Sequence, residues 1–583
     1  MSEKRSDVTI AIVGSGGEGV VSAGEILLRA AAQDGLFGMM VKSYGPQIRG
    51  GESLAQVRLQ ETPVLSQGDA LDALVVLSWE NFFRFSTEIV VRKGGSIFHD
   101  SDERVPEDLP FPPDTRFLAV PFLQTAKRVA GSALTKNIVA LGFLATWFGL
   151  PPGGFQKEIA ERFAGKGEPV VTANLKSFEA GMALAEAHAS RVRHRWSGVA
   201  HAPKLILTGN EAISLGALFA GVRFFAGYPI TPASEIMEWM ARELPKVDGV
   251  FVQAEDEIAA LTMVIGASFG GAKAMTATSG PGLSLMTEAM GLAAMAELPI
   301  VIVDVQRGGP STGIPTKTSQ ADLLHTVFGG HGNLPRIVLA PVDVADAIHI
   351  IVHAFYLAEK YQLPVLVLSD QFLGQRLEVI RPVDFQALSD QVIDRIRPSE
   401  EELIAYRRFK ITETGVSPIT MPGMKGGMYT AAGIEHDEMG RPTSDADIHE
   451  KMTWKRWKKL QTVEQREANL LWHDGDADAR VGIMTWGSTK GVVEEAVSRL
   501  RREGFKLATL VPRRLVPLPV APIQAFLDRL QALLVVELST GQFHTFLNSQ
   551  LRLPDTVRLC QRAGAAPFTV GEIVNAIKEV HAA

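Results

Sequence analysis

A short turn between a strand and a helix presents the first residue with a possible chemical role. The turn Gly227-Tyr-Pro-Ile-Thr-Pro-Ala-Ser-Glu235 joins a predicted strand at 222–226 to a predicted amphipathic helix at 234–243. Its two prolines fix φ and remove two backbone donors, which predicts an extended and rigid segment. In an open α/β sheet such a turn faces the crevice where ligands bind. Thr231 is the side chain that it holds out, although a Pro-x-x-Pro pair also serves as plain punctuation between elements.

Two charged side chains are predicted to follow the ends of further strands. The predicted strand 250–255 ends in Glu255, and the predicted strand 299–307 ends in Arg307. Between them, Thr276-Ala-Thr-Ser-Gly-Pro-Gly282 reads as a glycine turn that opens a helix. The acidic run at 255–257 has an ordinary alternative, because carboxylates also complement a helix N-terminus.

These segments, together with Ser311-Thr-Gly-Ile-Pro-Thr-Lys-Thr-Ser-Gln-Ala-Asp322, resemble the α subunit of the 2-oxoacid:ferredoxin oxidoreductases. The resemblance is strongest to the 2-oxoglutarate (2-oxoglutarate synthase) type, and it extends over most of the chain. It implies a coenzyme A-dependent oxidative decarboxylation of 2-oxoglutarate to succinyl-CoA and CO₂, reversible as CO₂ fixation, with electrons passing to ferredoxin. Pyruvate, branched 2-oxoacids and indolepyruvate are the alternative substrates.

The resemblance implies that the chain binds thiamine diphosphate, which carries the difficult step of the chemistry. Five residues are expected to contact this cofactor: Tyr228, Pro229, Ile230, Glu255 and Ser279. A carboxylate in a dry pocket drives the aminopyrimidine of thiamine to its imine tautomer. Glu255 is the predicted catalytic carboxylate, and Glu257 is the residue most easily confused with it.

The resemblance also assigns residues to the substrate. Arg307 is expected to bind the C1 carboxylate of the 2-oxoacid with two parallel hydrogen bonds. Thr231 is expected to donate to the same carboxylate or to the developing oxyanion. Lys317 is expected to meet the distal carboxylate of a dicarboxylic substrate.

An absence indicates a partner subunit. Thiamine enzymes hold the diphosphate and Mg²⁺ through Gly-Asp-Gly and a later Asn-Asn, and neither occurs in this sequence. The single cysteine, Cys560, cannot hold an iron–sulfur cluster, which needs about four. The resemblance places Mg²⁺, the diphosphate half-site and the [4Fe–4S] cluster on a β subunit, in an α₂β₂ assembly, with no metal on this chain.

The fold class predicted is multidomain α/β. Residues 1–190 resemble the γ domain of these enzymes, and 204–385 are predicted to form the doubly wound parallel sheet that binds the thiamine pyrimidine. Residues 386–477 are an irregular connecting segment, and 478–583 resemble the C-terminal domain of transketolase. The basic run at 190–203 is predicted to be a linker.

The first domain contains a literal G-x-G-x-x-G, formed by Gly14, Gly16 and Gly19 after a predicted strand. No acidic residue ends the second strand, so a nicotinamide dehydrogenase is a weaker alternative to simple strand–helix packing. A later turn carries Arg49 beside a glycine pair, which suits an anionic ligand such as coenzyme A.

Two features of the connecting segment have competing interpretations. Glu435-His-Asp-Glu438 is interpreted as a solvated turn, because adjacent residues in a loop do not readily converge on a metal ion. Trp454 and Trp457 alternate with lysines, as in some nucleic-acid-binding segments. Their spacing of three puts them on one helical face, which we predict to be packed down.

Bulk properties narrow the class of protein. The net charge of −7 gives no electrostatic footprint for nucleic acid. The longest apolar run, 138–150, is too short to span a bilayer, and one cysteine suits a reducing compartment, so we expect a cytoplasmic protein. A non-catalytic scaffold subunit is the remaining alternative.

Overall fold

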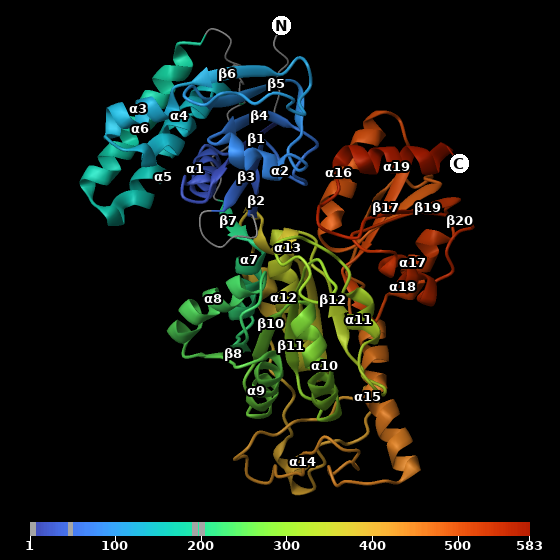
Figure 1. Ribbon diagram of the computed structural model, residues 1–583. Helices are drawn as coiled ribbons and strands as arrows, with labels where there is room; N and C mark the ends of the chain where they lie inside the picture. The colour runs from blue at the N-terminus through green and yellow to red at the C-terminus, as the bar shows by residue number, and fades with distance from the viewer. Residues whose placement is uncertain (1–6, 45–50, 189–195, 197–203, 583) are drawn as a thin grey trace. The chain divides into compact units, whose positions relative to one another are not determined.

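The computed structural model describes residues 7–44, 51–188, 196 and 204–582 (Figure 1). The chain divides into two compact units. The first unit comprises Met1–Leu207 and Arg376–Pro382, and the second comprises Thr208–Gln375 and Val383–Ala583. Arg49 and most of the predicted linker lie outside the described residues.

The first unit is built on a mixed eight-stranded sheet. Its strands, in spatial order, are β6 (Arg116–Val120), β5 (Val91–Asp100), β4 (Leu71–Val76), β1 (Asp7–Ser15), β3 (Glu52–Gln60), β2 (Phe37–Tyr44), β14 (Leu377–Ile380) and β7 (Leu205–Thr208). Its helices are α1 (Val20–Gln33), α2 (Trp79–Phe85), α3 (Phe122–Ala130), α4 (Lys136–Phe148), α5 (Pro152–Phe163) and α6 (Glu168–Glu186).

The second unit contains a seven-stranded sheet whose apolar strands form a continuous core. The order is β18 (Arg514–Val516), β12 (Ile337–Leu339), β13 (Pro364–Asp370), β11 (Ile300–Gln306), β10 (Ala274–Thr278), β8 (Phe224–Gly227) and β9 (Val250–Gln253). All are parallel except β18, which is antiparallel to β12. The helices of this part are α7 (Gly209–Phe219), α8 (Ser234–Glu243), α9 (Glu257–Phe269), α10 (Gly280–Met295), α11 (Leu323–Phe328), α12 (Val344–Tyr361) and α13 (Gln371–Gln375).

A five-stranded sheet ends the chain. Its order is β15 (Leu471–Gly475), β17 (Leu507–Pro512), β16 (Val481–Met484), β19 (Ala532–Glu537) and β20 (Thr556–Gln561), with β15 alone antiparallel. Its helices are α16 (Lys490–Arg502), α17 (Val520–Leu527), α18 (Gln542–Gln550) and α19 (Val570–Ala582). The predicted multidomain α/β class is therefore confirmed, and the second unit contains the predicted parallel sheet.

The connecting segment contains two helices, α14 (Glu400–Ile404) and the long α15 (Ala446–Arg466). A buried charge cluster joins α15 to the end of α10. Lys455 Nζ donates to both oxygens of Glu297 at 2.7 Å, and Lys459 Nζ lies 2.5 Å from the same carboxylate. Arg408 donates to the Glu297 carbonyl at 2.7 Å. All four side chains are fully buried.

This cluster explains why one sequence prediction is wrong. Trp454 and Trp457 are not packed down; their residues are 59% and 37% exposed. The buried face of α15 instead carries Lys455 and Lys459, because Glu297 stabilises their ammonium groups there.

The segment Glu435–Glu438 is also not a simply solvated turn. His436 is buried, and its ring lies 4.0 Å from that of Phe409. Glu435 pairs with Arg456 at 2.8 Å, and hydrogen bonds from Arg456 and His449 help to lower the pKa of Glu435 to about 2 against the effect of burial. No group of three potential metal ligands is found among the described residues.

Candidate functional site

Four of the predicted site residues follow four adjacent strands of the seven-stranded sheet. Thr231 follows β8, Glu255 follows β9, Ser279 follows β10 and Arg307 follows β11. Because these strands are parallel, the turns after them meet at one edge of the sheet. The structure therefore gathers these turns where ligands bind in open α/β sheets.

Arg307 is tied to the turn that carries Thr231. Its Nη1 donates to the backbone carbonyl of Thr231 at 2.5 Å, and its Nη2 donates to the carbonyl of Thr312 at 3.0 Å. The residue is only 7% exposed, and its Nε has no partner among the described residues. Burial lowers the pKa of Arg307, and Asp322 opposes that shift. The guanidinium is thus held in one orientation while its Nε stays available, and the side chain of Thr231 is exposed beside it.

The acidic run after β9 separates into three different environments. Asp256 is the N-cap of α9, because its Oδ1 accepts from the backbone N–H of Ala259 at 2.7 Å. Glu257 is the first residue of that helix and is 6% exposed. Glu255 precedes the cap, and in the single chain its residue is exposed. The structure therefore gives the more buried position to Glu257.

Glu257 packs against the start of α10 at a position that only glycine permits. A Cβ at Gly282 would lie 2.6 Å from Glu257 Oε1 and 2.1 Å from Thr278 Oγ1. Among the residues that the structure describes, no donor bonds to the Glu257 carboxylate. A buried acid without a donor of its own fits a partner such as a ring nitrogen of a bound cofactor.

The other predicted cofactor contacts differ in exposure. Tyr228 and Pro229 are exposed and Ile230 is half-buried, so this turn presents a surface at the strand ends. Ser279 is fully buried, and its Oγ donates to the carbonyl of Val305 at 2.9 Å. The Ser279 hydroxyl therefore ties two strand ends together.

Lys317, predicted to reach a distal carboxylate, lies in the loop 308–322 that follows β11. The residue is half-buried, and its carbonyl accepts from the Gly308 N–H at 2.9 Å, which closes the loop at its base. The loop therefore brings Lys317 back beside Gly308, the residue that follows Arg307 at the end of β11.

The C-terminal sheet holds the far end of this loop, a role that the sequence analysis missed. Gln320 Nε2 donates to the Trp486 carbonyl at 2.9 Å, and Gln320 Oε1 accepts from Leu538 N–H at 2.9 Å. Gln542 Nε2 donates to the Ala321 carbonyl at 2.6 Å. The contacting residues are distant in sequence, so no local pattern indicates them.

Two acids near the site were also missed. Asp304 lies within β11 and is fully buried, and Asp322 ends the loop. Asp322 belongs to the sequence motif, but the motif alone gave it no role.

In the glycine turn of the first unit, the carboxylate of Glu18 occupies the place where a bound phosphate would be expected. Glu18 Oε2 accepts from the Ser15 N–H at 2.7 Å, and Glu18 Oε1 accepts from Lys136 Nζ at 2.8 Å. Gly16 N–H donates to the Gly51 carbonyl at 2.7 Å. These donors are the ones that a dinucleotide phosphate would use, so the turn favours strand–helix packing over a nicotinamide site.

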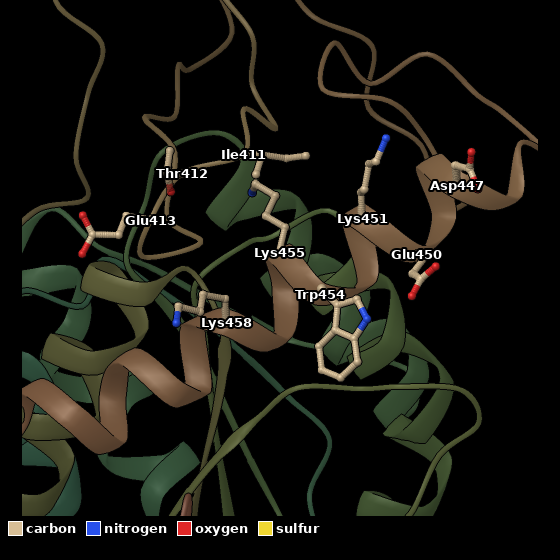
Figure 2. A pocket seen from close by; sticks show the side chains of 9 residues that line it. All are labelled: Ile411, Thr412, Glu413, Asp447, Glu450, Lys451, Trp454, Lys455 and Lys458. Carbon is tan, nitrogen blue, oxygen red and sulfur yellow. The ribbon is translucent and has the colours of Figure 1, made fainter.

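A groove with a volume of about 550 Å³ lies along α15, between that helix and the loop at 411–413 (Figure 2). Its lining mixes signs and includes the exposed Trp454, Lys451 and Glu450. It is formed by the connecting segment, and none of the predicted site residues lines it.

Within the described part of the chain, no helix has both the length and the apolar character needed to cross a bilayer.

Three family models match successive parts of the chain. "Pyruvate ferredoxin/flavodoxin oxidoreductase" matches residues 9–184. "Pyruvate flavodoxin/ferredoxin oxidoreductase, thiamine diP-bdg" matches 215–455. "Pyruvate:ferredoxin oxidoreductase core domain II" matches 479–573. The thiamine-binding match includes all the strand ends described above.

Relatives and a solved structure agree with these matches. The α subunit of 2-oxoacid:ferredoxin oxidoreductase 2 from Aeropyrum pernix is 29% identical over 98% of this chain and 98% of its own length. The 2-oxoglutarate synthase subunit KorA of Methanothermobacter marburgensis is 40% identical over 64% of this chain and 97% of its own. The 2-oxoglutarate:ferredoxin oxidoreductase from Magnetococcus marinus, solved with 2-oxoglutarate, coenzyme A and succinyl-CoA bound, is 38% identical. Its TM-score is 0.93, with 99% of each chain covered.

Proposed function

Because this chain belongs to the α subunits of the 2-oxoacid:ferredoxin oxidoreductases, we propose that its substrate is 2-oxoglutarate. The proposed reaction is coenzyme A-dependent oxidative decarboxylation to succinyl-CoA and CO₂, with electrons passing to ferredoxin. The observation that carries the proposal is the match over 99% of both chains to an enzyme solved with 2-oxoglutarate, coenzyme A and succinyl-CoA.

Thiamine diphosphate supplies the nucleophilic carbon for attack on the carbonyl of the 2-oxoacid. This chain's contribution is a carboxyl group that exchanges a proton with the pyrimidine ring. We assign that role to Glu257 in preference to Glu255, because Glu257 is buried and has no donor of its own. Exclusion of water strengthens such a proton-sharing contact. Glu255, exposed in the single chain, stays an untested prediction and provides the matched comparison.

The substrate is held by groups at the ends of β8 and β11. Arg307 supplies the cationic donors for the C1 carboxylate, and two backbone hydrogen bonds already fix its orientation. Thr231 adds a hydroxyl beside it, and Tyr228, Pro229 and Ile230 form the adjoining surface for the cofactor. Lys317 is proposed to bind the distal carboxylate of 2-oxoglutarate.

We propose that a β subunit completes the site. It would carry the diphosphate half-site, Mg²⁺ and the [4Fe–4S] cluster, because this sequence has neither Gly-Asp-Gly nor Asn-Asn and has one cysteine. An α₂β₂ assembly that works in the cytoplasm and passes electrons to ferredoxin follows from the same resemblance.

The domain roles proposed are those that the sequence suggested. Residues 1–190 would form the γ-type domain, 204–385 the pyrimidine-binding domain, 386–477 the connecting segment and 478–583 the transketolase C-terminal-like domain. Family-model matches at 9–184 and 479–573 support the first and last of these domains, whereas the match at 215–455 extends from the pyrimidine-binding domain into the connecting segment. Arg49 stays the proposed coenzyme A contact.

The test is to purify the complex of this chain with its β subunit and to assay a panel of 2-oxoacids. Each assay contains coenzyme A and a low-potential electron acceptor. The proposal expects the highest kcat/KM with 2-oxoglutarate, and Lys317→Met is expected to weaken that preference over pyruvate. A higher kcat/KM with pyruvate, a branched 2-oxoacid or indolepyruvate would correct the substrate. Turnover of none of them would contradict the enzyme class.

A further inference from the structure

Two carboxyl groups near Arg307, one fully buried and one half-buried, lack ordinary hydrogen-bond donors among the described residues. Asp304, in β11, is fully buried, and neither of its carboxylate oxygens has a partner among the described residues. Asp322, at the end of the loop 308–322, has a buried Oδ2 that also lacks one. Burying an ionised carboxylate without donors is costly, so native structures rarely leave one in this state.

The backbone of β11 brings the two acids together. Asp304 and Gln306 are two residues apart in a strand and therefore share one face of the sheet. Gln306 Oε1 accepts from the Asp322 N–H at 3.1 Å, and Gln306 Nε2 donates to the Ser369 carbonyl at 3.0 Å. Asp322 is thus held over the face of β11 that carries Asp304.

The start of α10 encloses Asp322 from another side. A Cβ at Gly280 would lie 2.8 Å from Asp322 Oδ2 and 3.0 Å from Oδ1. A glycine at this position lets the helix approach the carboxyl group closely, which helps to keep solvent from its Oδ2.

The electrostatic surroundings of the pair are simple within the described residues. Among these residues, the only ionisable group that influences Asp304 is Asp322, and Asp322 is influenced by Asp304 and Arg307. Burial and the neighbouring Asp322 raise the pKa of Asp304 well above its ordinary value. Burial raises the pKa of Asp322 to about 6, and Arg307 opposes that rise. Adjacent buried carboxylates do not both ionise, so one proton is shared between them near neutral pH.

We propose that Asp304 and Asp322 form a proton-sharing carboxyl pair that acts as the counter-charge of Arg307 and sets its affinity for the substrate carboxylate. The inference rests on the proposed function, in which Arg307 binds that carboxylate. Ionised Asp322 offsets part of the guanidinium charge that the substrate experiences, whereas protonated Asp322 does not. Neither acid needs to touch the substrate, so both are positioning residues.

The kinetic test is the pH dependence of KM for 2-oxoglutarate in the complex with the β subunit. As the pH falls through about 6, Asp322 gains its proton, so KM should fall by roughly threefold to tenfold. Asp322→Asn should keep the low KM at every pH. Asp304→Asn should leave the inflection near pH 6, because Asp304 is already protonated and neutral there and the amide keeps a donor in its place.

A second readout needs no turnover. An infrared pH titration of the full chain alone should show a carboxyl band changing near pH 6 that Asp322→Asn abolishes. Asp346→Asn is the matched control, since Asp346 is another buried acid whose pKa burial raises, and it faces Arg513 and Asp343. That variant should leave the pH profile of KM unchanged.

Two results would overturn the inference. One is a band near pH 6 that persists in Asp322→Asn, and the other is a pH profile of KM that Asp322→Asn leaves unchanged. Failure of the proposed function looks different. In that case no 2-oxoacid is turned over, while the infrared band still titrates and still disappears in Asp322→Asn, which supports the carboxyl pair by itself.

Discussion

At the scale of single residues, two hydrogen bonds hold Arg307 in the orientation that the proposed carboxylate contact requires. Its two Nη atoms are already bonded to the carbonyls of Thr231 and Thr312. A guanidinium fixed in this way loses little further conformational freedom when it binds an anion. The same bonds link substrate recognition to the shape of the turn that carries Thr231.

We expect Arg307→Ala to lower kcat/KM for 2-oxoglutarate, with a loss of transition-state stabilisation of about 2–5 kcal/mol, because a buried charge-assisted contact is lost. Arg307→Lys keeps the charge without the planar fork and should restore only part of the loss. Affinity for thiamine diphosphate should change little. Steady-state kinetics and cofactor binding in the purified complex measure both quantities, and an equal loss for cofactor and substrate would place Arg307 elsewhere.

The sequence predicted the strand ends well but not which acid of the run at 255–257 is buried. Glu255 and Glu257 are two residues apart, and periodicity alone does not distinguish them. The missing signal is Asp256, a good N-cap, which makes Glu257 the first helical residue and leaves Glu255 outside. Asp304 was missed because the sequence shows an acid within an apolar strand but not that it faces Asp322, eighteen residues further on.

At the scale of elements, α15 shows how buried charge can hold an irregular segment in place. One carboxylate, Glu297, faces Lys455 and Lys459, while Arg408 bonds to its carbonyl. Burial lowers the pKa of Lys459 to about 7 and that of Lys455 to about 8, although Glu297 opposes both shifts. Removal of the one acid would leave these cations buried without a counter-charge.

We therefore expect Glu297→Gln to destabilise the chain by about 3–5 kcal/mol. Lys459→Met should cost less, because it removes one of the surplus cations and keeps an aliphatic side chain. Urea unfolding followed by tryptophan fluorescence compares the two variants, with Trp454 and Trp457 on α15 as reporters. Equal losses in both variants would contradict this account of the cluster.

The same cluster predicts a pH dependence with a definite sign. The folded-state pKa values of Lys459 and Lys455 lie below the value of about 10.4 for an unfolded lysine. Between about pH 7 and 10 the unfolded chain therefore binds more protons at these sites, so their contribution to stability rises with pH. Lys459→Met should reduce that rise in urea unfolding measured at pH 7 and pH 9. An unchanged rise would show that Lys459 is not the responsible group.

Element boundaries were largely predictable, whereas long-range pairing was not. The helix at 234–243 was predicted and is α8, because its apolar spacing and its preceding turn agree. In contrast, β14 lies between two segments of the second unit in sequence but pairs with β2 in the sheet of the first unit. Likewise, β18 from the C-terminal region pairs with β12. Such pairings join residues that are distant in sequence, such as Val338 with Val516 and Leu377 with Met40, so no local pattern indicates them.

At the scale of the whole molecule, we propose that the chain supplies one half of a site. Its strand ends offer Glu257, Thr231 and Arg307, but its sequence lacks the motif that binds the diphosphate and Mg²⁺. We expect the purified single chain to be inactive and free of iron, and the addition of its β subunit to restore turnover. Metal analysis and visible absorbance of the single chain check this directly, and iron bound to it would refute the expectation.

The central claim is that this chain provides the carboxyl group that exchanges a proton with the thiamine pyrimidine. The most direct measurement is the rate of hydrogen–deuterium exchange at C2 of thiamine diphosphate bound to the complex. We predict that Glu257→Gln slows exchange by about 10²–10⁴-fold, because an amide cannot share the proton, while Glu255→Gln leaves it nearly unchanged. Unchanged exchange in Glu257→Gln, or slowing in Glu255→Gln alone, would contradict the account and return the role to Glu255 or to another group.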